Sequence, residues 1–265
     1  LYQSAAIDSA QAEQSILEMT QSLTHRGPDD TNIYISDESH WYFGHRRLSI
    51  LDTSKGGLQP MTSHSGNLVI TYNGEIYNHL EIRDELEKEN PLIYWKSTSD
   101  TETLLEAFDQ WGVNATLPKV RGMFSIALWD KINKDFYLIR DRFGEKPLYY
   151  GWAQLNQSSA FCFASELKAF KALPDFANQI SQEALIQYFS YMYVPCPLSI
   201  YNGIYKLEPG CILKISSKPP TEEINKAPHV LSGKTFEHDS LIISKWYDLS
   251  EVVNTSSKNL FDDYI

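Results

Sequence analysis

Cysteine is scarce in this sequence of 265 residues. Its three copies, Cys162, Cys196 and Cys211, are scattered, and none has the Cys-x-x-Cys or cysteine/histidine spacing of a metal site. An odd, dispersed set of cysteines argues against a disulfide framework and against a cysteine-ligated metal. We therefore expect no metal in this chain and a reducing, cytoplasmic location.

Long apolar runs and clusters of basic residues are also absent. No stretch approaches the roughly 18 apolar residues of a membrane span. The formal net charge is −11, whereas nucleic-acid-binding domains usually carry a basic surface. These absences argue against a membrane or a nucleic acid as a partner. What is present, 42% hydrophobic residues, suffices for the core of one large domain or two small ones.

The pair Asn73-Gly74 follows an apolar run at residues 68–72. Asn-Gly is the strongest short signal for a β-hairpin turn, and taken alone it favours that interpretation. A second interpretation is chemical. An asparagine amide beside a glycine N–H at a strand end can direct two hydrogen-bond donors at one developing negative charge, as in an oxyanion hole. The neighbouring motifs favour this second interpretation.

Two arginines occur together in residues 44–52, inside a strand-like stretch. The planar guanidinium of Arg46 or Arg47 matches a carboxylate with two parallel hydrogen bonds. One of the two could therefore hold the main-chain carboxylate of an amino acid.

Residues 99–102, Ser-Asp-Thr-Glu, predict the start of a helix. Serine followed three residues later by glutamate is the pattern of a capping box. Asp100 then lies in the first turn, where it either complements the helix dipole or holds the ammonium group of a substrate. The sequence around Asp100 leaves both roles open.

Together these motifs resemble the glutaminase domain of the glutamine-dependent asparagine synthetases, a class II glutamine amidotransferase domain of the N-terminal-nucleophile (Ntn) hydrolase type. The resemblance follows the family's order over residues 20–212. Residues 44–49 differ from the arginine segment of amidotransferases that act on phosphoribosyl and sugar phosphates. The motifs that carry it are His-Arg-Gly-Pro-Asp-Asp (25–30), Gln-Pro-Met (59–61), Tyr-Asn-Gly-Glu-Ile-Tyr-Asn (72–78), Ser-Asp-Thr-Glu (99–102), Val-Arg-Gly-Met-Phe-Ser-Ile-Ala (120–127), Arg-Asp-Arg-Phe-Gly-Glu-Lys-Pro-Leu-Tyr-Tyr (140–150), Phe-Ala-Ser-Glu-Leu-Lys (163–168) and Tyr-Val-Pro (193–195).

The resemblance implies how the main-chain groups of glutamine are bound. Arg47 corresponds to the arginine that grips the α-carboxylate, and the backbone of Leu48 and Ile50 lines the same pocket. Glu75 and Asp100 correspond to the two carboxylates that hold the α-amino group. A site of fixed charges rejects analogues that leave a buried charge unpaired.

The resemblance also implies the catalytic groups. Asn73 and Gly74 correspond to the oxyanion hole. The family's nucleophile is an N-terminal cysteine whose own α-amino group serves as the base, with a reference pKa of about 7.7–8.0. This chain begins Leu-Tyr-Gln-Ser and has no Cys-Gly-Ile segment before the first expected helix. We interpret the chain as a fragment that lacks the first strand and the cysteine; the alternative is a homologue that binds glutamine without hydrolysing it.

The expected fold class is α+β, and the resemblance implies a four-layer αββα sandwich of two antiparallel sheets flanked by helices. Helical periodicity is seen at residues 10–24 and after Ser99, and helices are expected at 166–173 and 181–191. The β-rich segments are 41–51, 68–72, 124–130, 136–140, 148–152, 160–164 and 211–215. Residues 131–135 predict a hairpin turn.

Segments 140–150 and 216–240 both have structural interpretations, and no catalytic role is expected for segment 140–150. The charged residues of segment 140–150 are expected to form an ion network that fixes a turn; a role at the interface with a following domain is the alternative. Residues 216–240 predict a long mobile loop because prolines and polar residues are frequent there.

We therefore expect a glutaminase domain over residues 1–212, followed at 213–265 by a long loop and a linker to an ATP-dependent synthetase domain. No Ser-Gly-Gly-x-Asp-Ser loop is present, so ATP and Mg²⁺ are expected only in that further domain. The expected activity is hydrolysis of L-glutamine to glutamate and ammonia, which ATP-activated aspartate accepts in cis to give asparagine. The alternatives are an amidotransferase acting on a cell-envelope sugar or peptide, and a non-catalytic glutamine-binding domain. A homodimer is also left open.

Overall fold

A seven-stranded antiparallel sheet forms one of two β layers in the computed structural model, which describes residues 1–2, 9–36, 40–49, 52, 54–155, 158–220, 223–224 and 226–259. Its strand order is β11-β12-β10-β6-β5-β4-β3. The strands are β3 (Met61–Thr62), β4 (Leu68–Ile76), β5 (Gly122–Asp130), β6 (Asp135–Arg140), β10 (Cys211–Ser216), β11 (Thr235–His238) and β12 (Leu241–Lys245). The central pair, β5 and β6, is joined by the hairpin turn expected at residues 131–135.

The second β layer has two parts. One is the hairpin of β1 (Asp30–Ile35) and β2 (Tyr42–Arg47); the other is the sheet β8-β7-β9, formed by β7 (Tyr149–Leu155), β8 (Ser158–Ala164) and β9 (Ile204–Lys206). Residues 1–2 lie between the two parts. The N–H of Tyr42 donates to the Leu1 carbonyl at 2.9 Å, and the N–H of Tyr2 donates to the Phe161 carbonyl at 2.9 Å.

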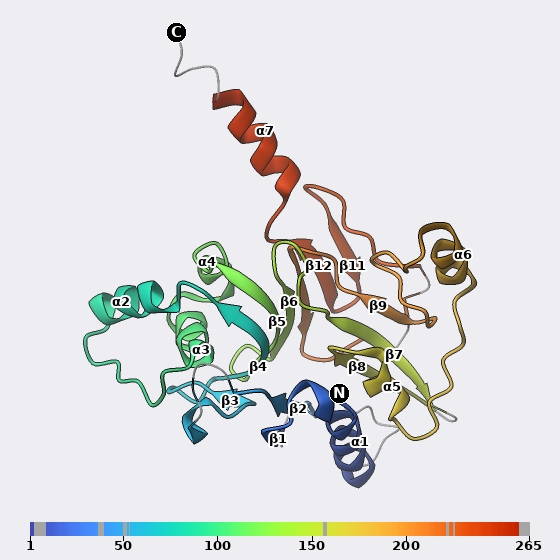
Figure 1. Cartoon of the computed structure of the whole chain (residues 1–265), viewed down its shortest axis with the longest axis horizontal. Coiled ribbons are helices and arrows are strands. Elements are labelled where there is room, and N and C mark those ends of the chain that lie inside the picture. Colours follow the sequence, from blue (N-terminus) through green and yellow to red (C-terminus); the bar gives the residue numbers. More distant parts are fainter. Residues whose placement is uncertain are drawn as a thin grey trace.

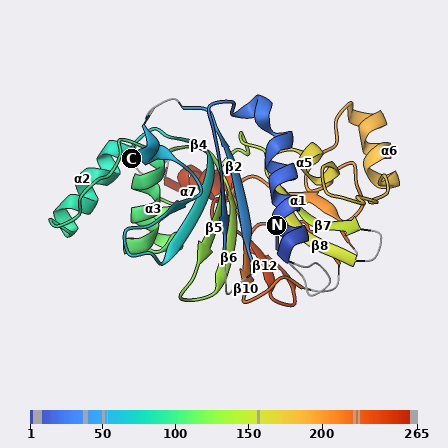
Figure 2. The same ribbon diagram turned by 90° about the horizontal axis from the view of Figure 1, so that it is seen from below.

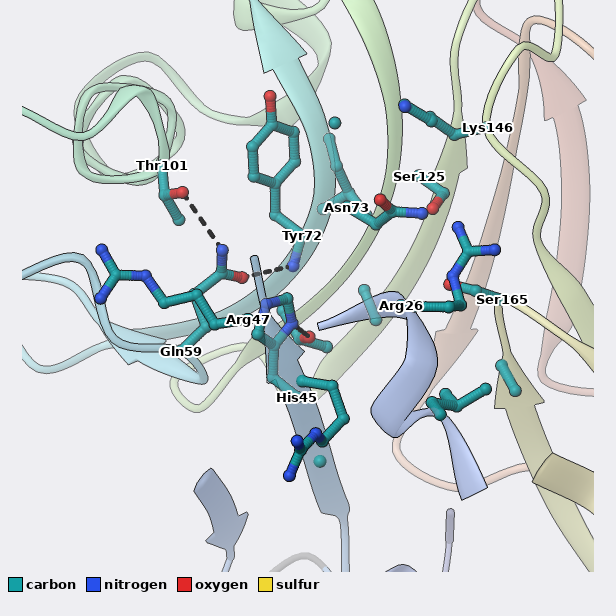
Figure 3. Close-up of a pocket in the computed structure, with 18 of the residues that line it drawn as sticks. Arg26, His45, Arg47, Gln59, Tyr72, Asn73, Thr101, Ser125, Lys146 and Ser165 are labelled. Atoms are coloured by element: carbon teal, nitrogen blue, oxygen red, sulfur yellow. Dashed lines mark hydrogen bonds between the residues drawn. The ribbon is translucent and has the colours of Figure 1, made fainter. Parts of the chain in front are cut away.

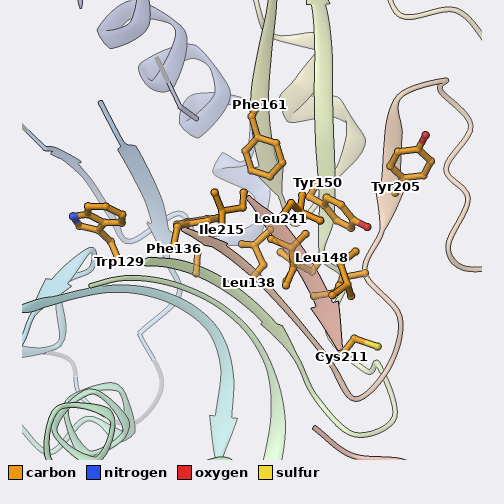
Figure 4. Packing of buried hydrophobic residues seen from close by; sticks show 14 of the residues in the cluster. Trp129, Phe136, Leu138, Leu148, Tyr150, Phe161, Tyr205, Cys211, Ile215 and Leu241 are labelled. Atoms are coloured by element: carbon orange, nitrogen blue, oxygen red, sulfur yellow. The ribbon is translucent and has the colours of Figure 1, made fainter. Parts of the chain in front are cut away.

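Aromatic side chains fill the space between the two β layers (Figure 4). Trp41 of the second layer stacks on Phe136 of the large sheet, with ring centroids 3.9 Å apart. Phe161 meets Phe136 edge to face at 6.4 Å. Trp129 and Trp152 are also among the fully buried side chains. Burial of such large rings is the main stabilising contribution to this interface.

Helices cover the outer faces of both layers (Figures 1 and 2). The apolar face of α3 (Asp100–Trp111) packs on the seven-stranded sheet, and α2 (His79–Glu89) packs against α3 in the same buried cluster. On the opposite side, α1 (Ser9–Ser22) and α5 (Leu167–Lys171) pack on the second layer. The expected four-layer αββα sandwich of the α+β class is therefore confirmed. The remaining helical elements are η1 (Thr24–Arg26), η2 (Lys55–Gly57), α4 (Val113–Thr116), α6 (Gln182–Tyr191) and α7 (Leu249–Asn259).

The region after residue 212 belongs to the large sheet. Strand β10 spans the expected boundary and pairs on one side with β6, Leu213 opposite Leu138, and on the other with β12, Leu213 opposite Ile243. The segment 216–240, expected to be a loop, contains β11, which pairs with β12 at the sheet edge. Beyond β12, α7 projects away from the sandwich (Figure 1).

The charged segment 140–150 forms a turn, but its charges bind backbone groups rather than an ion network. The Arg140 guanidinium donates to the carbonyls of Gly144 (2.6 Å) and Lys146 (2.8 Å). The Asp141 carboxylate accepts four backbone N–H groups, from residues 143, 145 and 146 at 3.0 Å each and from Phe124 at 3.2 Å. The guanidinium of Arg142 lies over the rings of Trp246 and Tyr247, so this turn also contacts the segment that leads to α7.

Candidate active site

A cavity of about 350 Å³ opens between the two β layers. Strands β2 and β4 and the first turn of α3 line one part of it, and α1, β8 and α5 line the other. Six of the seven residues predicted for the site reach this cavity: Arg47, Leu48, Asn73, Gly74, Glu75 and Asp100. The seventh, Ile50, lies outside the described residues.

Arg47, at the end of β2, is 7% exposed and is held by the loop that follows it. Its Nη1 donates to the Ser54 carbonyl at 2.7 Å and to the Asp30 carboxylate at 3.3 Å, and its Nη2 donates to the Asp52 carbonyl. A Cβ at Gly57 would lie 2.3 Å from Nη2, so any larger residue there would displace the guanidinium. The guanidinium is thus fixed in place beside the cavity.

Asp52 fixes the loop that holds Arg47. Its carboxylate accepts the N–H of Ser54 at 2.7 Å and the N–H of Thr98 at 2.9 Å. The hydrogen bond from Ser54, with those from Thr98, lowers the pKa of the Asp52 carboxyl although burial opposes the shift. The carboxylate therefore joins the loop after β2 to the segment that precedes α3, and its role is to position Arg47.

Asp100 lies in the first turn of α3 and is 6% exposed. Its Oδ2 accepts the Tyr72 hydroxyl at 2.7 Å and the N–H of Ile76 at 2.9 Å. Burial, together with the Asp100 charge, raises the pKa of Tyr72 well above its usual value, so the phenol remains a proton donor. Both bonds fix Asp100 against the edge of β4.

The predicted capping box at residues 99–102 is half correct. The Ser99 side chain accepts the N–H of Thr101 at 3.1 Å, as an N-cap should. The Glu102 carboxylate, however, accepts the N–H groups of Lys96 (2.9 Å) and Ser97 (2.8 Å), because the chain before the helix folds back over it. Glu102 therefore orders the approach to α3 rather than closing the box.

Asn73 points into the cavity with an unpaired donor (Figure 3). The turn interpretation of Asn73-Gly74 is wrong, because β4 continues through both residues to Ile76 and pairs Asn73 with Ser125. Among the described residues, the buried Asn73 Nδ2 has no hydrogen-bond partner. A buried amide donor without a partner costs about 1–3 kcal/mol. Asn73 Nδ2 is therefore a donor in the cavity wall without an acceptor among the described residues.

The N–H of Gly74 lies on the free edge of β4. Residues two apart in a strand direct their N–H groups to the same side, and those of Tyr72 and Ile76 bind side chains at this edge, Gln59 Oε1 at 2.6 Å and Asp100 Oδ2 at 2.9 Å. The Gly74 N–H lies between them. A Cβ at Gly74 would come within 2.2 Å of the Met123 carbonyl, so only glycine lets β4 and β5 approach here.

Glu75 and Leu48 complete the predicted set. Glu75 is two residues from Asn73 in β4, so the two side chains share the face of the strand that lines the cavity. Leu48 follows β2 and is 56% exposed. The guanidinium of Arg47 and the carboxylates of Glu75 and Asp100 thus belong to the lining of one cavity.

Sequence reasoning did not assign Gln59 or His45 to the site. The Gln59 amide spans the cavity wall, accepting the Tyr72 N–H and donating to Thr101 Oγ1 at 3.3 Å (Figure 3). His45 Nδ1 lies 3.1 Å from Thr71 Oγ1. The signal for Gln59 was its place in the Gln-Pro-Met motif; His45 had only its position two residues before Arg47.

His45 should make the folded state sensitive to acid. Burial, with the nearby Arg47 charge, lowers its pKa from 6.5 to about 4. Between these values the unfolded chain binds a proton that the folded chain does not, so stability falls as the pH falls from 6.5 to 4, by at most about 3 kcal/mol. We expect His45→Gln to reduce this acid dependence, measured as the urea midpoint at pH 7 and pH 4.5. Equal acid losses in the variant and the parent protein would contradict the assignment.

Comparison with known proteins identifies the family. A sequence profile of the glutamine amidotransferase domain matches residues 4–225. This chain belongs to the glutamine amidotransferase domain family. The chain is 41% identical over 201 residues to asparagine synthetase [glutamine-hydrolyzing] 1 of Bacillus subtilis, covering 76% of this chain and 30% of that protein. It is 33% identical over 258 residues to asparagine synthetase [glutamine-hydrolyzing] 3 of the same organism, covering 96% and 36%.

The amidotransferase chain therefore spans about a third of the length of these curated relatives. Among solved structures it resembles the glutamine phosphoribosylpyrophosphate amidotransferase of B. subtilis, with a TM-score of 0.57 and 16% identity over 88% of this chain and 46% of that one. At this identity the likeness concerns the fold, and it agrees with the αββα sandwich.

None of the three cysteines is among the residues that line the cavity. Burial raises the pKa of Cys162 to about 11 and that of Cys211 to about 12, which leaves both as inert thiols. Cys196 lies beside the Arg140 guanidinium, with Sγ 3.5 Å from Nη1. None of the described helices is long and apolar enough to cross a membrane.

Proposed function

We propose that the cavity binds L-glutamine and that its side-chain amide is hydrolysed there to glutamate and ammonia. The observation that carries this proposal is the unpaired Nδ2 of Asn73, buried in the cavity wall beside the free-edge N–H of Gly74. Two donors that converge without an internal acceptor suit a charge that appears only during reaction. The proposal assigns the oxyanion of the tetrahedral intermediate to them.

In this proposal the charges around the cavity hold the main-chain groups of glutamine. Arg47 binds the α-carboxylate, with the backbone of Leu48 beside it. Glu75 and Asp100 bind the α-ammonium group. Because the loop after β2 already fixes Arg47 and β4 already fixes Asp100, little conformational entropy is lost when the substrate binds. An analogue without either charged group leaves a buried partner unpaired and is rejected.

The nucleophile is proposed by resemblance to the family, which uses the thiol of an N-terminal cysteine and its own α-amino group as the base. The thiolate attacks the amide carbon, the oxyanion forms at Asn73 and Gly74, ammonia leaves with the proton that the amine took up, and water hydrolyses the thioester. The cysteine is assigned to sequence outside the 265 residues, since none of the described cysteines lines the cavity.

We further propose that ammonia passes to a synthetase domain of the same polypeptide, where ATP-activated aspartate accepts it to give asparagine in the cytoplasm. The names of the curated relatives support this acceptor. Residues that would hold ATP and Mg²⁺ are assigned to that further domain. An acceptor in the cell envelope is the alternative within the same chemistry.

The test uses the natural full-length protein with glutamine labelled with ¹⁵N in its amide, together with aspartate, ATP and Mg²⁺. We expect the protein to release glutamate and to form asparagine that carries ¹⁵N in its side-chain amide. Mass spectrometry detects the labelled asparagine. Glutamate release without labelled asparagine would support the glutaminase and reject the acceptor.

A second candidate function, glutamine binding without hydrolysis, is favoured by the lack of a cysteine among the described lining residues. Calorimetric titration separates the two candidates. Binding of L-glutamine but not D-glutamine, with no release of glutamate, would support the binding domain. Failure of L-glutamine to bind would reject both candidates.

A further inference from the structure

A cluster of three charged side chains and one histidine joins η1 to the start of α5. Glu166, the residue before α5, accepts Nη1 of Arg26 at 2.8 Å and lies 3.0 Å from Nε2 of His25, both through Oε1. Lys168 Nζ lies 2.7 Å from Nδ1 of His25. The cluster connects two segments that are 140 residues apart in the chain.

The chemistry of these contacts determines the state of His25. An ammonium group only donates, so Nδ1 of His25 accepts from Lys168 and the ring proton lies on Nε2, from which it is donated to Glu166. Although burial raises it, hydrogen bonds from Arg26 and His25 bring the pKa of the Glu166 carboxyl below its usual value. Glu166 is thus a carboxylate with two donors on one oxygen.

Arg26 is the member of the cluster that lines the cavity. Figure 3 shows its guanidinium on the same side as Asn73 and Ser125, away from Gln59 and Thr101. The next residue, Gly27, packs against β2 so closely that a Cβ would lie 2.4 Å from the Arg46 carbonyl oxygen. Arg46 in turn donates from Nε to the Gly27 carbonyl at 2.8 Å. The backbone of this turn is therefore fixed, and the direction of the Arg26 side chain depends on Glu166.

A purely stabilising role explains the cluster poorly. The side chains of Arg26 and Glu166 are 32% and 27% exposed, and ion pairs of this kind contribute about 0–1 kcal/mol to stability. The geometric consequence is larger, because the pair holds a cation at the side of the cavity where Asn73 directs its free donor. Small displacements of a group near the reacting atoms can lower the rate about 10²-fold.

We propose that Glu166 is a positioning residue that holds Arg26 at the amide end of the glutamine site. This inference rests on the proposed glutaminase function. Two acidic residues therefore position two different arginines. Asp52 orders Arg47 at the α-carboxylate end of the site, and Glu166 orders Arg26 at the reacting end.

The experiment replaces Glu166 with glutamine in the natural full-length protein, which retains the shape of the side chain and removes its charge. We expect kcat for glutamate release to fall about tenfold while KM for glutamine stays within about twofold, because Arg26 lies away from the groups that bind the α-carboxylate and α-ammonium. In a double-mutant cycle, Arg26→Ala and Glu166→Ala should be non-additive, the second change adding little once the first is made.

The matched control is Glu208→Gln, which removes another carboxylate paired with a histidine, His229 at 2.7 Å, outside the cavity lining. It should leave both kinetic parameters unchanged at a similar thermal midpoint. An unchanged kcat in Glu166→Gln, or additive effects in the cycle, would overturn the positioning role while the parent enzyme remains active. Absence of glutamate release from the parent protein would instead overturn the proposed function.

Discussion

Replacing Asn73 with alanine is expected to lower kcat for glutamine hydrolysis about 10²–10³-fold with only a modest change in KM. The reason is that Asn73 Nδ2 has no acceptor among the residues that the structure describes, so its binding energy is available to the transition state alone. Loss of one preorganised oxyanion donor typically has this magnitude. Steady-state glutamate release by the full-length variant measures both parameters.

The matched control is Asn133→Ala in the turn between β5 and β6, where the asparagine amide binds Asp130 and lies far along the hairpin from the Asn73 pairing site. That variant should retain its turnover. If Asn73→Ala instead raised KM as much as it lowered kcat, Asn73 would bind the ground state, and the oxyanion role would be rejected.

Replacing Arg47 with lysine is expected to raise KM for glutamine about 10- to 100-fold with little change in kcat. The guanidinium must donate to the loop carbonyls of Asp52 and Ser54 and also face the cavity. A lysine ammonium is a compact point charge, so it cannot bind the loop carbonyls and face the cavity at the same time. A lost hydrogen bond between charged groups costs about 1.5–3 kcal/mol. This cost corresponds to the expected increase in KM.

Ammonia-dependent synthesis by the full-length Arg47→Lys variant should survive, because ammonia bypasses the glutamine site. Loss of both activities would indicate misfolding. Arg46→Lys is the matched comparison, since Arg46 holds the backbone of residues 27 and 28. Equal effects of the two changes on KM would reject Arg47 as the specific carboxylate partner.

The residue types at the site could be predicted from the sequence because each belongs to a short motif. Arg47, Asn73, Gly74, Glu75 and Asp100 all reach one cavity, as expected. The backbone at Asn73-Gly74 could not be predicted in the same way. Asn-Gly favours a turn locally, but nine paired positions with β5 and a close approach at Gly74 keep the segment extended.

The supporting contacts were beyond sequence reasoning because they join distant segments. Asp52 reaches Thr98, and Gln59 reaches Thr101, across more than 40 residues without a local pattern. Glu102 is a local case: its helix-start motif predicted a capping box, but its carboxylate accepts the N–H groups of Lys96 and Ser97, six and five residues before it. Local patterns therefore identified the groups that would face a substrate, and tertiary contacts determined what holds them.

The strands after residue 212 show a different limit of prediction from the sequence. β11 has exposed Thr235 and Glu237 alternating with half-buried Phe236 and His238. A short edge strand of this kind has little apolar signal, so the prolines and polar residues around it favoured a loop. Its place was determined by pairing with β12.

The extension of the large sheet also determines where the polypeptide can be shortened. A product ended at residue 212 would cut β10 after its second residue and remove the strands that pair with β6 and β10. The edge of β6 would then be open beside Phe136 and Leu138, which the removed Leu213, Ile215 and Leu241 help to bury. Open apolar edges recruit strands from other molecules, so such a product should aggregate during expression, whereas one ended after β12 at residue 248 should stay monodisperse.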